Sequence, residues 1–273
     1  MIVVTGILSL WIIQAVTHYP SGMEASDHII SSSEPLKPEI NATTLFNTGT
    51  MILGNDIKNL VILIPNEAHE SPQGQEGERL ISQPYVPQNA IVSNGTKILW
   101  FNANVGHSHK VTLTSNEGVG SKEQVLFDTG YFAFNEASRF VVLNKEGTLT
   151  YQEAAVDEED KSFAMNGTIK VVNQPLSSNL ASSYANQSTI SNKIDTVGTY
   201  VLPSKDLEGY VSEFTDKGFI IENTHTFKDL HDGQKGTGDE QTLVVWTTSS
   251  SSGMTLGKVL SALQEITPRL PYI

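Results

Sequence analysis

Two histidines separated by a single residue are the most chemically suggestive feature of this sequence. His107 and His109 stand directly before the β-branched stretch that begins at Val111. Side chains at positions i and i+2 of a strand point to the same face of a sheet, so two imidazoles in a strand could chelate one ion. Imidazole is a ligand that suits copper and zinc. The pair therefore predicts either a metal site or, more plainly, two solvent-facing loop residues.

Three further side chains are candidate metal ligands. Glu153 and Met165 lie in the segment GTLTYQEAAVDEEDKSFAMNGTIKVVN, and His69 lies in a polar loop after an early apolar run. A carboxylate binds Cu(II) or a hard cation, whereas a thioether is a weak, soft ligand. Glu153 equally suits a polar strand end, and Met165 suits a core position. The acidic run at 157–160 lacks the spacing of a calcium loop and indicates a solvated turn.

The segments around His109 and Glu153 resemble those that flank the copper site of cupredoxins, which are small β-sandwich proteins. In that family a His ligand precedes a Val-Thr strand, as in His109-Lys-Val-Thr here. The family's second segment runs G-T-Y-x-Y-x-C-x-x-H-x-x-M-x-G-x-I. With an insertion before the Met, this chain matches it at Gly147, Thr148, Tyr151, Met165, Gly167 and Ile169. Glu153 occupies the Cys position and the second His position falls near Val156, so the resemblance implies a cupredoxin fold with a broken blue-copper site.

This resemblance leaves two functions open. The cupredoxin-like domains in the B subunit of copper-dependent methane and ammonia mono-oxygenases use an H-x-H pair without a thiolate, and only His107 and His109 match that pattern. One hypothesis is therefore a module that binds Cu(II) through these two residues, with His69, Glu153 and Met165 as additional candidate ligands. The alternative is a metal-free structural or protein-interaction module of the cell envelope. No nucleophile or acid–base pair in a known arrangement predicts an enzyme.

Composition narrows the classes of partner and cofactor. None of the 273 residues is a Cys, which excludes a disulfide framework, an iron–sulfur cluster and a thiolate copper centre. The chain carries 17 Lys and Arg against 30 Asp and Glu, a net charge of −13. Binding to phosphate backbones requires clustered basic residues, so we expect no nucleic acid as partner. The partner that we expect is a protein of the cell envelope.

The N-terminus and the sequons predict export. Residues 2–16 are apolar apart from Thr5, Ser9 and Gln14. A helix of that length spans about 22 Å, less than the hydrocarbon core of a bilayer. We therefore predict a signal peptide or short membrane anchor at 1–25. The N-x-S/T triplets favour a glycosylated protein of the archaeal or bacterial exterior; they begin at Asn41, Asn94, Asn166 and Asn186.

The strand-like runs predict an all-β Greek-key sandwich of the cupredoxin type over residues 51–174. Short apolar runs alternate with Gly- and Asn-rich turns, at 59–64, 90–92, 97–102, 110–114, 139–143, 148–152 and 168–172. The polar segments 26–50 and 175–196 are expected to be linkers.

The last part of the chain, residues 197–273, has a different pattern. A strand at 199–202 precedes a helix that follows Ser204, and two strands at 219–227 and 243–247 precede a second helix capped by Thr255. This β-α-β-β-α order predicts a small α+β domain with a core of its own.

The absence of Cys makes a spectroscopic prediction. The intense blue colour of a type 1 centre arises from a copper–thiolate bond, which this chain cannot form. Titration with Cu(II) should therefore produce at most the weak absorption of nitrogen and oxygen ligands. An intense blue protein in a visible absorption spectrum would contradict the argument.

Overall fold

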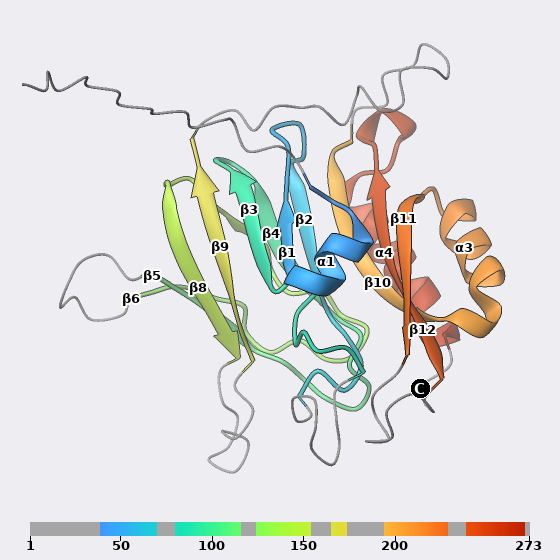
Figure 1. Ribbon diagram of the computed structural model, residues 1–273. Helices are drawn as coiled ribbons and strands as arrows, with labels where there is room; N and C mark the ends of the chain where they lie inside the picture. Colours follow the sequence, from blue (N-terminus) through green and yellow to red (C-terminus); the bar gives the residue numbers. More distant parts are fainter. Residues whose placement is uncertain are drawn as a thin grey trace, which may run out of the picture. The chain divides into compact units, whose positions relative to one another are not determined.

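A computed structural model of the chain describes residues 39–69, 80–115, 124–153, 165–173, 194–228 and 239–270. This part of the chain forms two six-stranded mixed sheets, and helices flank the second sheet (Figure 1). Several predictions concern residues outside these ranges: the signal peptide or anchor at 1–25, the acidic run at 157–160, the sequon at Asn186 and all but the last three residues of the linker at 175–196.

The first sheet contains most of the segments that carry the cupredoxin motifs. Its strands, in spatial order, are β1 (Thr50–Ile52), β3 (Asn89–Ser93), β9 (Asn166–Val172), β8 (Gly147–Glu153), β5 (Val111–Ser115) and β6 (Gln124–Asp128). The first three strands run parallel to one another, and the remaining pairs are antiparallel. Buried and exposed residues alternate along β3 and β9, as expected of strands with one face on a core.

The second sheet joins strands that are far apart in the sequence. Its order is β11 (Ile220–Lys228), β12 (Glu240–Thr248), β10 (Thr196–Pro203), β2 (Asn59–Ile64), β4 (Lys97–Asn102) and β7 (Val141–Val142). β2 pairs in parallel with β4 on one side and with β10 on the other. All six residues of β2 are buried, which explains why its sequence, NLVILI, is continuously apolar rather than alternating.

Helices lie on both faces of the second sheet (Figure 1). The helical segments are α1 (Ala42–Thr48), η2 (Ser204–Asp206), α3 (Leu207–Asp216), η3 (Ser250–Ser252), α4 (Leu256–Ile266) and η4 (Thr267–Arg269). Tyr200 of β10 packs its ring edge-on against Phe214 of α3 and donates a 2.9 Å hydrogen bond to Thr267 of η4. Its neighbour Thr199 points to the opposite face, where its hydroxyl donates to the Val86 carbonyl at 2.8 Å. β10 is therefore enclosed from both sides.

The predicted fold class, a β-sandwich followed by a smaller α+β part, is confirmed. Each strand predicted from the sequence overlaps an observed one, although only Val141 and Val142 of the run at 139–143 pair in a sheet. β1 and β6 were not predicted. β1 is only three residues long, and three of the five residues of β6 are exposed, so neither has a clear buried alternation.

The predicted division into two cores differs from the structure. Residues 35–273 form one compact unit. Thr196, Val197 and Gly198 of β10 pair with Asn59, Leu60 and Val61 of β2, so the C-terminal strands extend the sandwich sheet instead of building a second one. Strands this far apart in the sequence pair because their buried surfaces fit together. The local pattern of apolar residues does not predict such a pairing.

The predicted linker at 26–50 is also corrected over its last residues. Residues 42–48 form α1, where Asn41 is the N-cap and its side-chain oxygen accepts from the backbone N–H groups of Thr43 and Thr44. Leu45 is buried in the core, and the Gln83 amide donates to its carbonyl at 2.9 Å. Because a seven-residue helix is marginal alone, this docking is what holds it.

The contact between β10 and β12 gives a stability prediction. A Cβ atom added at Gly198 would lie 2.2 Å from the buried Trp246 ring, whereas nothing lies within 4 Å of one added at Gly209 on α3. Gly198→Ala should lower the free energy of unfolding by about 1–3 kcal/mol through overpacking. Gly209→Ala should leave it unchanged or raise it by up to about 1 kcal/mol, the helix propensity gain.

Urea denaturation followed by far-UV circular dichroism measures both variants. Because the two cores are continuous, Gly198→Ala should shift a single transition. A separate early transition with the sandwich unaffected would support two independent domains instead.

Candidate functional site

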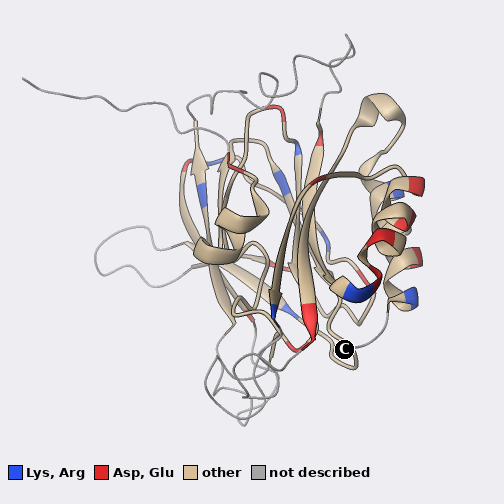
Figure 2. Ribbon diagram, turned by 45° about the vertical axis from the view of Figure 1, so that its right-hand side comes forward, with Lys and Arg blue, Asp and Glu red and all other residues tan. Residues whose placement is uncertain are grey.

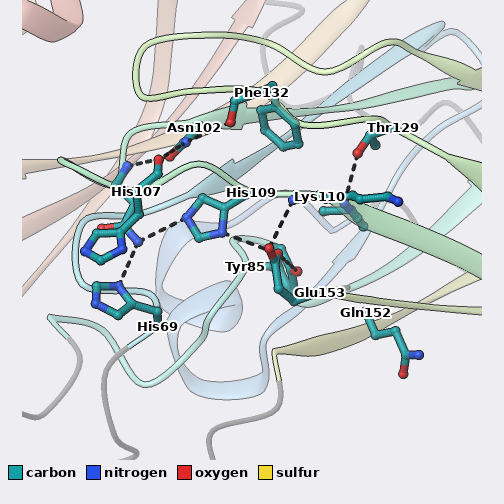
Figure 3. A network of polar contacts seen from close by, with 12 residues as sticks. His69, Tyr85, Asn102, His107, His109, Lys110, Thr129, Phe132, Gln152 and Glu153 are labelled. Atoms are coloured by element: carbon teal, nitrogen blue, oxygen red, sulfur yellow. Dashed lines mark hydrogen bonds and ion pairs between the residues drawn. The ribbon is translucent and has the colours of Figure 1, made fainter. Parts of the chain in front are cut away.

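The candidate ligands are brought to one end of the sandwich by strand pairing (Figure 3). Val111 of β5 faces Glu153 at the end of β8, which brings Glu153 next to the segment holding His109. The backbone of His109 exchanges two 3.0 Å hydrogen bonds with that of Phe132, and its side chain is buried. His69 arrives from the turn after β2, and its ring lies close to that of His107.

The Glu153 carboxylate has three polar neighbours within the protein. One oxygen accepts from the backbone N–H of Lys110 at 3.0 Å. The other accepts from the Tyr85 hydroxyl at 3.3 Å and lies 3.3 Å from His109 Nδ1. Carboxylate oxygens are hydrogen-bond acceptors, and both oxygens have partners here. The residue at the family's Cys position is thus held by protein donors.

Asn104 is the centre of the histidine cluster. Its side-chain Nδ2 lies 2.9 Å from His69 Nδ1 and 3.1 Å from His109 Nε2. Its Oδ1 accepts from the backbone N–H of Glu67 at 3.1 Å, which fixes the orientation of the amide. Since an amide nitrogen only donates, both ring nitrogens accept. His109 therefore carries its proton on Nδ1 and donates it to Glu153.

The two histidines of the H-x-H motif differ in burial: His107 is exposed, whereas His109 is buried. Both precede β5, in a turn where Gly106 has φ of +79° and Asn102 donates to the His107 carbonyl at 2.8 Å. His107 is exposed, and its ring centroid lies 3.7 Å from that of His69. His109 is paired with Phe132 in an isolated antiparallel β-bridge.

Met165 contributes through its backbone. Its side chain is buried, and its carbonyl accepts from the N–H of Glu153 at 2.9 Å, which suits the core role considered from the sequence. Within the part of the chain that the structure describes, no three or more His, Asp or Glu side chains are arranged to hold a metal ion. The described residues also contain no helix long and apolar enough to cross a membrane.

A type 1 copper does not fit the residues at this end of the sandwich. The thiolate is missing, and the Glu153 oxygens and both nitrogens of His109 already have partners in the protein. A metal at His109 would have to break a hydrogen bond to Asn104 or Glu153. The observed set of donors and acceptors is balanced without a cation.

Three residues of the network were missed by sequence reasoning. Asn102, Asn104 and Tyr85 carry no metal-ligand signature. The Asn-rich run FNANVGHSH was the available sign, since amides beside histidines supply the donors that fix ring tautomers. Tyr151, which matched the family motif, packs edge-on against Tyr85 and Trp100. It is fully buried, and this burial raises the pKa of its phenol.

Comparison with known proteins finds cupredoxins among solved structures. No family model and no curated protein matches the chain. A purple cupredoxin from Nitrosopumilus maritimus is 19% identical, with a TM-score of 0.29, and the match covers 41% of this chain and 99% of that one. Auracyanin A, a "blue" copper protein from Chloroflexus aurantiacus, is 14% identical, with a TM-score of 0.30. That match covers 42% of this chain and 98% of that one. A copper-containing nitrite reductase from Thermus scotoductus is 12% identical, with a TM-score of 0.30, over 47% of this chain and 29% of its own. These proteins belong to the class that the sequence motifs resemble.

Removal of the Glu153 carboxylate tests the network. Glu153→Ala leaves the Lys110 N–H, the Tyr85 hydroxyl and His109 Nδ1 without this acceptor, and an unsatisfied buried donor costs about 1–3 kcal/mol. We expect the free energy of unfolding to fall by about 2 kcal/mol in urea denaturation. Glu153→Gln, which keeps one acceptor oxygen, should lose less.

Gln152→Ala is the matched control, because this neighbour on β8 is exposed and surface changes usually stay within about 0.5 kcal/mol. If Glu153→Ala proved as stable as the unmodified protein, the carboxylate would have no structural role.

Proposed function

We propose that this chain is a cupredoxin-like interaction module of the cell envelope that folds and acts without a bound metal. The observation that carries the proposal is the closed network at the end of the sandwich. The Glu153 carboxylate has three protein donors, and the Asn104 amide donates to His69 and His109. Every polar atom that a copper ion would use at His109 and Glu153 already has a partner.

The physical argument concerns what metal binding would displace. Cu(II) at His109 would have to replace a hydrogen bond from a buried amide, and Asn104 would then need a new acceptor for a donor that is 1% exposed. An unpaired buried polar group is costly. The compensating bond to a thiolate is absent, so the module lacks the ligand that gives the family its electron-transfer chemistry.

Charge and sequons support a partner outside the cell. A net charge of −13 disfavours nucleic acid, and Asn41, Asn94 and Asn166 are all exposed, as glycosylation sites must be. We propose an extracellular or envelope location, with a protein partner and no catalytic role. We also propose that the N-terminal apolar segment tethers the protein to a membrane.

A second candidate, Cu(II) binding, is favoured by one observation. Two imidazoles contact one amide group and a third lies against the first: Asn104 Nδ2 contacts His69 and His109, and the tilted His107 ring lies 3.7 Å from that of His69, centroid to centroid. Rotation of the Asn104 side chain would leave nitrogen ligands around the space that its amide fills. Such a site would use His107 and His109, as the H-x-H motif suggested, with His69 as the third ligand.

One experiment separates the two candidates. A ligand that binds only the folded state stabilises it, by about 2.7 kcal/mol at a hundredfold excess over its dissociation constant. For a metal-free module, the thermal midpoint should be the same in EDTA and in equimolar Cu(II), and protein purified without a His tag should contain no stoichiometric metal.

Variants identify the ligands if Cu(II) does stabilise the protein. A shift that disappears in the His107→Ala/His109→Ala double variant, but persists in Met165→Leu and in His225→Ala, a control histidine that contacts α1, would reject the metal-free proposal in favour of the second candidate. A shift that persists in all variants would indicate binding elsewhere.

A further inference from the structure

Exposed apolar side chains gather at one edge of the sandwich. Of the six large hydrophobic residues that are exposed in the described part of the chain, five lie on β6, on the turn after it and around β7; the sixth is Ile220 on β11. We call the five the β6–β7 patch: Val125, Leu126, Tyr131, Phe140 and Val142. Val125 is 60% and Tyr131 61% exposed. Single exposed apolar residues are ordinary, but a contiguous group marks an interaction surface.

Arg139 joins the two sheet edges into one surface. β6 is the last strand of the first sheet, and β7 is the last strand of the second. The Arg139 guanidinium donates to the Asp128 carbonyl at 2.6 Å and to the Thr129 carbonyl at 3.3 Å, and it lies over the Phe127 ring. Arg139 directly precedes Phe140, so this clamp fixes the segment leading into β7 against the end of β6.

The patch is not arranged for the addition of another strand. The pairing of β5 with β6 shifts register between Leu113 and Thr114, which leaves Leu126 as a bulge. Arg139 occupies the carbonyls that follow the bulge. Bulges and blocked carbonyls at a sheet edge prevent edge-to-edge pairing. The exposed side chains of β6 are therefore available for side-chain contacts, while continuous backbone pairing with a second copy is disfavoured.

The charge of the patch is opposite to that of the molecule. Lys97 lies over the Phe140 ring at 5.1 Å, Lys110 over the Tyr131 ring at 5.7 Å and Arg139 over the Phe127 ring. Among the described residues, only Lys110 of these three has a carboxylate partner, Asp128 at 2.9 Å. Basic groups thus border the apolar side chains in a chain whose net charge is −13.

Besides Asp128 and Glu136, which neighbour the patch in the sequence, acidic side chains gather on another part of the described surface. α3 carries Glu208, Glu213 and Asp216, and acidic segments mark this helix in Figure 2. Because an approaching acidic group is repelled by the molecule as a whole, Lys97 and Arg139, which form no ion pair among the described residues, make the β6–β7 patch the place where it is accepted. Complementary potentials of this kind select partners more than they add affinity.

We propose that the β6–β7 patch docks an acidic segment of a partner protein that carries aliphatic or aromatic side chains. The inference rests on the proposed interaction function and names its surface and partner chemistry. Apolar side chains of the partner would cover Leu126, Tyr131 and Phe140, while its carboxylates would pair with Lys97 and Arg139. An anionic membrane is disfavoured as the occupant by the net charge of −13.

Model peptides test the proposal on the full chain. The probes are fluorescent short peptides of alternating Glu and Leu, of Lys and Leu, and of Glu and Ser, titrated by anisotropy at low salt. We expect binding of the Glu–Leu peptide only. Leu126→Ser/Tyr131→Ser should weaken it at least about tenfold, since truncated anchor residues each cost more than about 1 kcal/mol. Lys97→Glu should weaken it too, and Ile220→Ser is the matched control.

Several results would overturn the proposal. These are equal binding of the Lys–Leu peptide, Glu–Leu binding that survives the patch variants, patch-dependent dimerisation in sedimentation velocity, or patch-dependent binding to vesicles of anionic lipid. Unchanged circular dichroism and thermal midpoints show that the variants remain folded. Failure here is distinguishable from failure of the metal-free function, because the latter is read from thermal unfolding with EDTA and Cu(II) and involves none of these residues.

Discussion

The parallel pairing of β2 with both β4 and β10 is the constraint on which the rest of the structure depends. β2 is buried along its whole length, and its two neighbours, β4 and β10, are far apart in the sequence. On one side β4 leads into the turn that holds Asn104, His107 and His109. On the other side β10 anchors β12, β11 and the helices. A parallel pair needs a long crossover connection, so this arrangement forces distant segments into one sheet and makes the sandwich and the C-terminal part a single core.

A polar network surrounds Glu153, at the position that matches the cupredoxin Cys. Glu153 is half-buried, and a charge withdrawn from water is unfavourable unless it is paired and hydrogen-bonded. The structure meets that requirement with the Lys110 backbone, Tyr85 and His109. Asn104 then satisfies the remaining nitrogen of His109 and extends the network to His69. The Glu153 carboxylate thus depends on two segments of the chain, one with Tyr85 and one with His109 and Lys110.

The same edge strands that complete the sheets also define the exposed surface. β6 ends in Asp128, whose pKa is lowered first by the Gly130 backbone N–H and then by Lys110, and Lys110 has its pKa raised in turn by Asp128. Both groups are solvent-exposed, so their contribution to stability is small. Their effect is geometric: the pair places the Lys110 ammonium beside Tyr131, at the border of an apolar surface.

The sequence by itself determined the strand-rich fold class, most strand positions and the failure of the blue-copper motif. These follow from local alternation, from β-branched runs and from the absence of any Cys. It also brought forward His69, His109 and Glu153, which the structure connects through a single network. Only the tertiary structure decided that α1 belongs to the core, that β10 joins β2, that His109 is buried while His107 is exposed, and that Asn104 lies between His69 and His109. Local patterns report which face of an element is apolar, whereas partners separated by many residues are chosen by the mutual fit of buried surfaces and by the need of each buried donor for an acceptor.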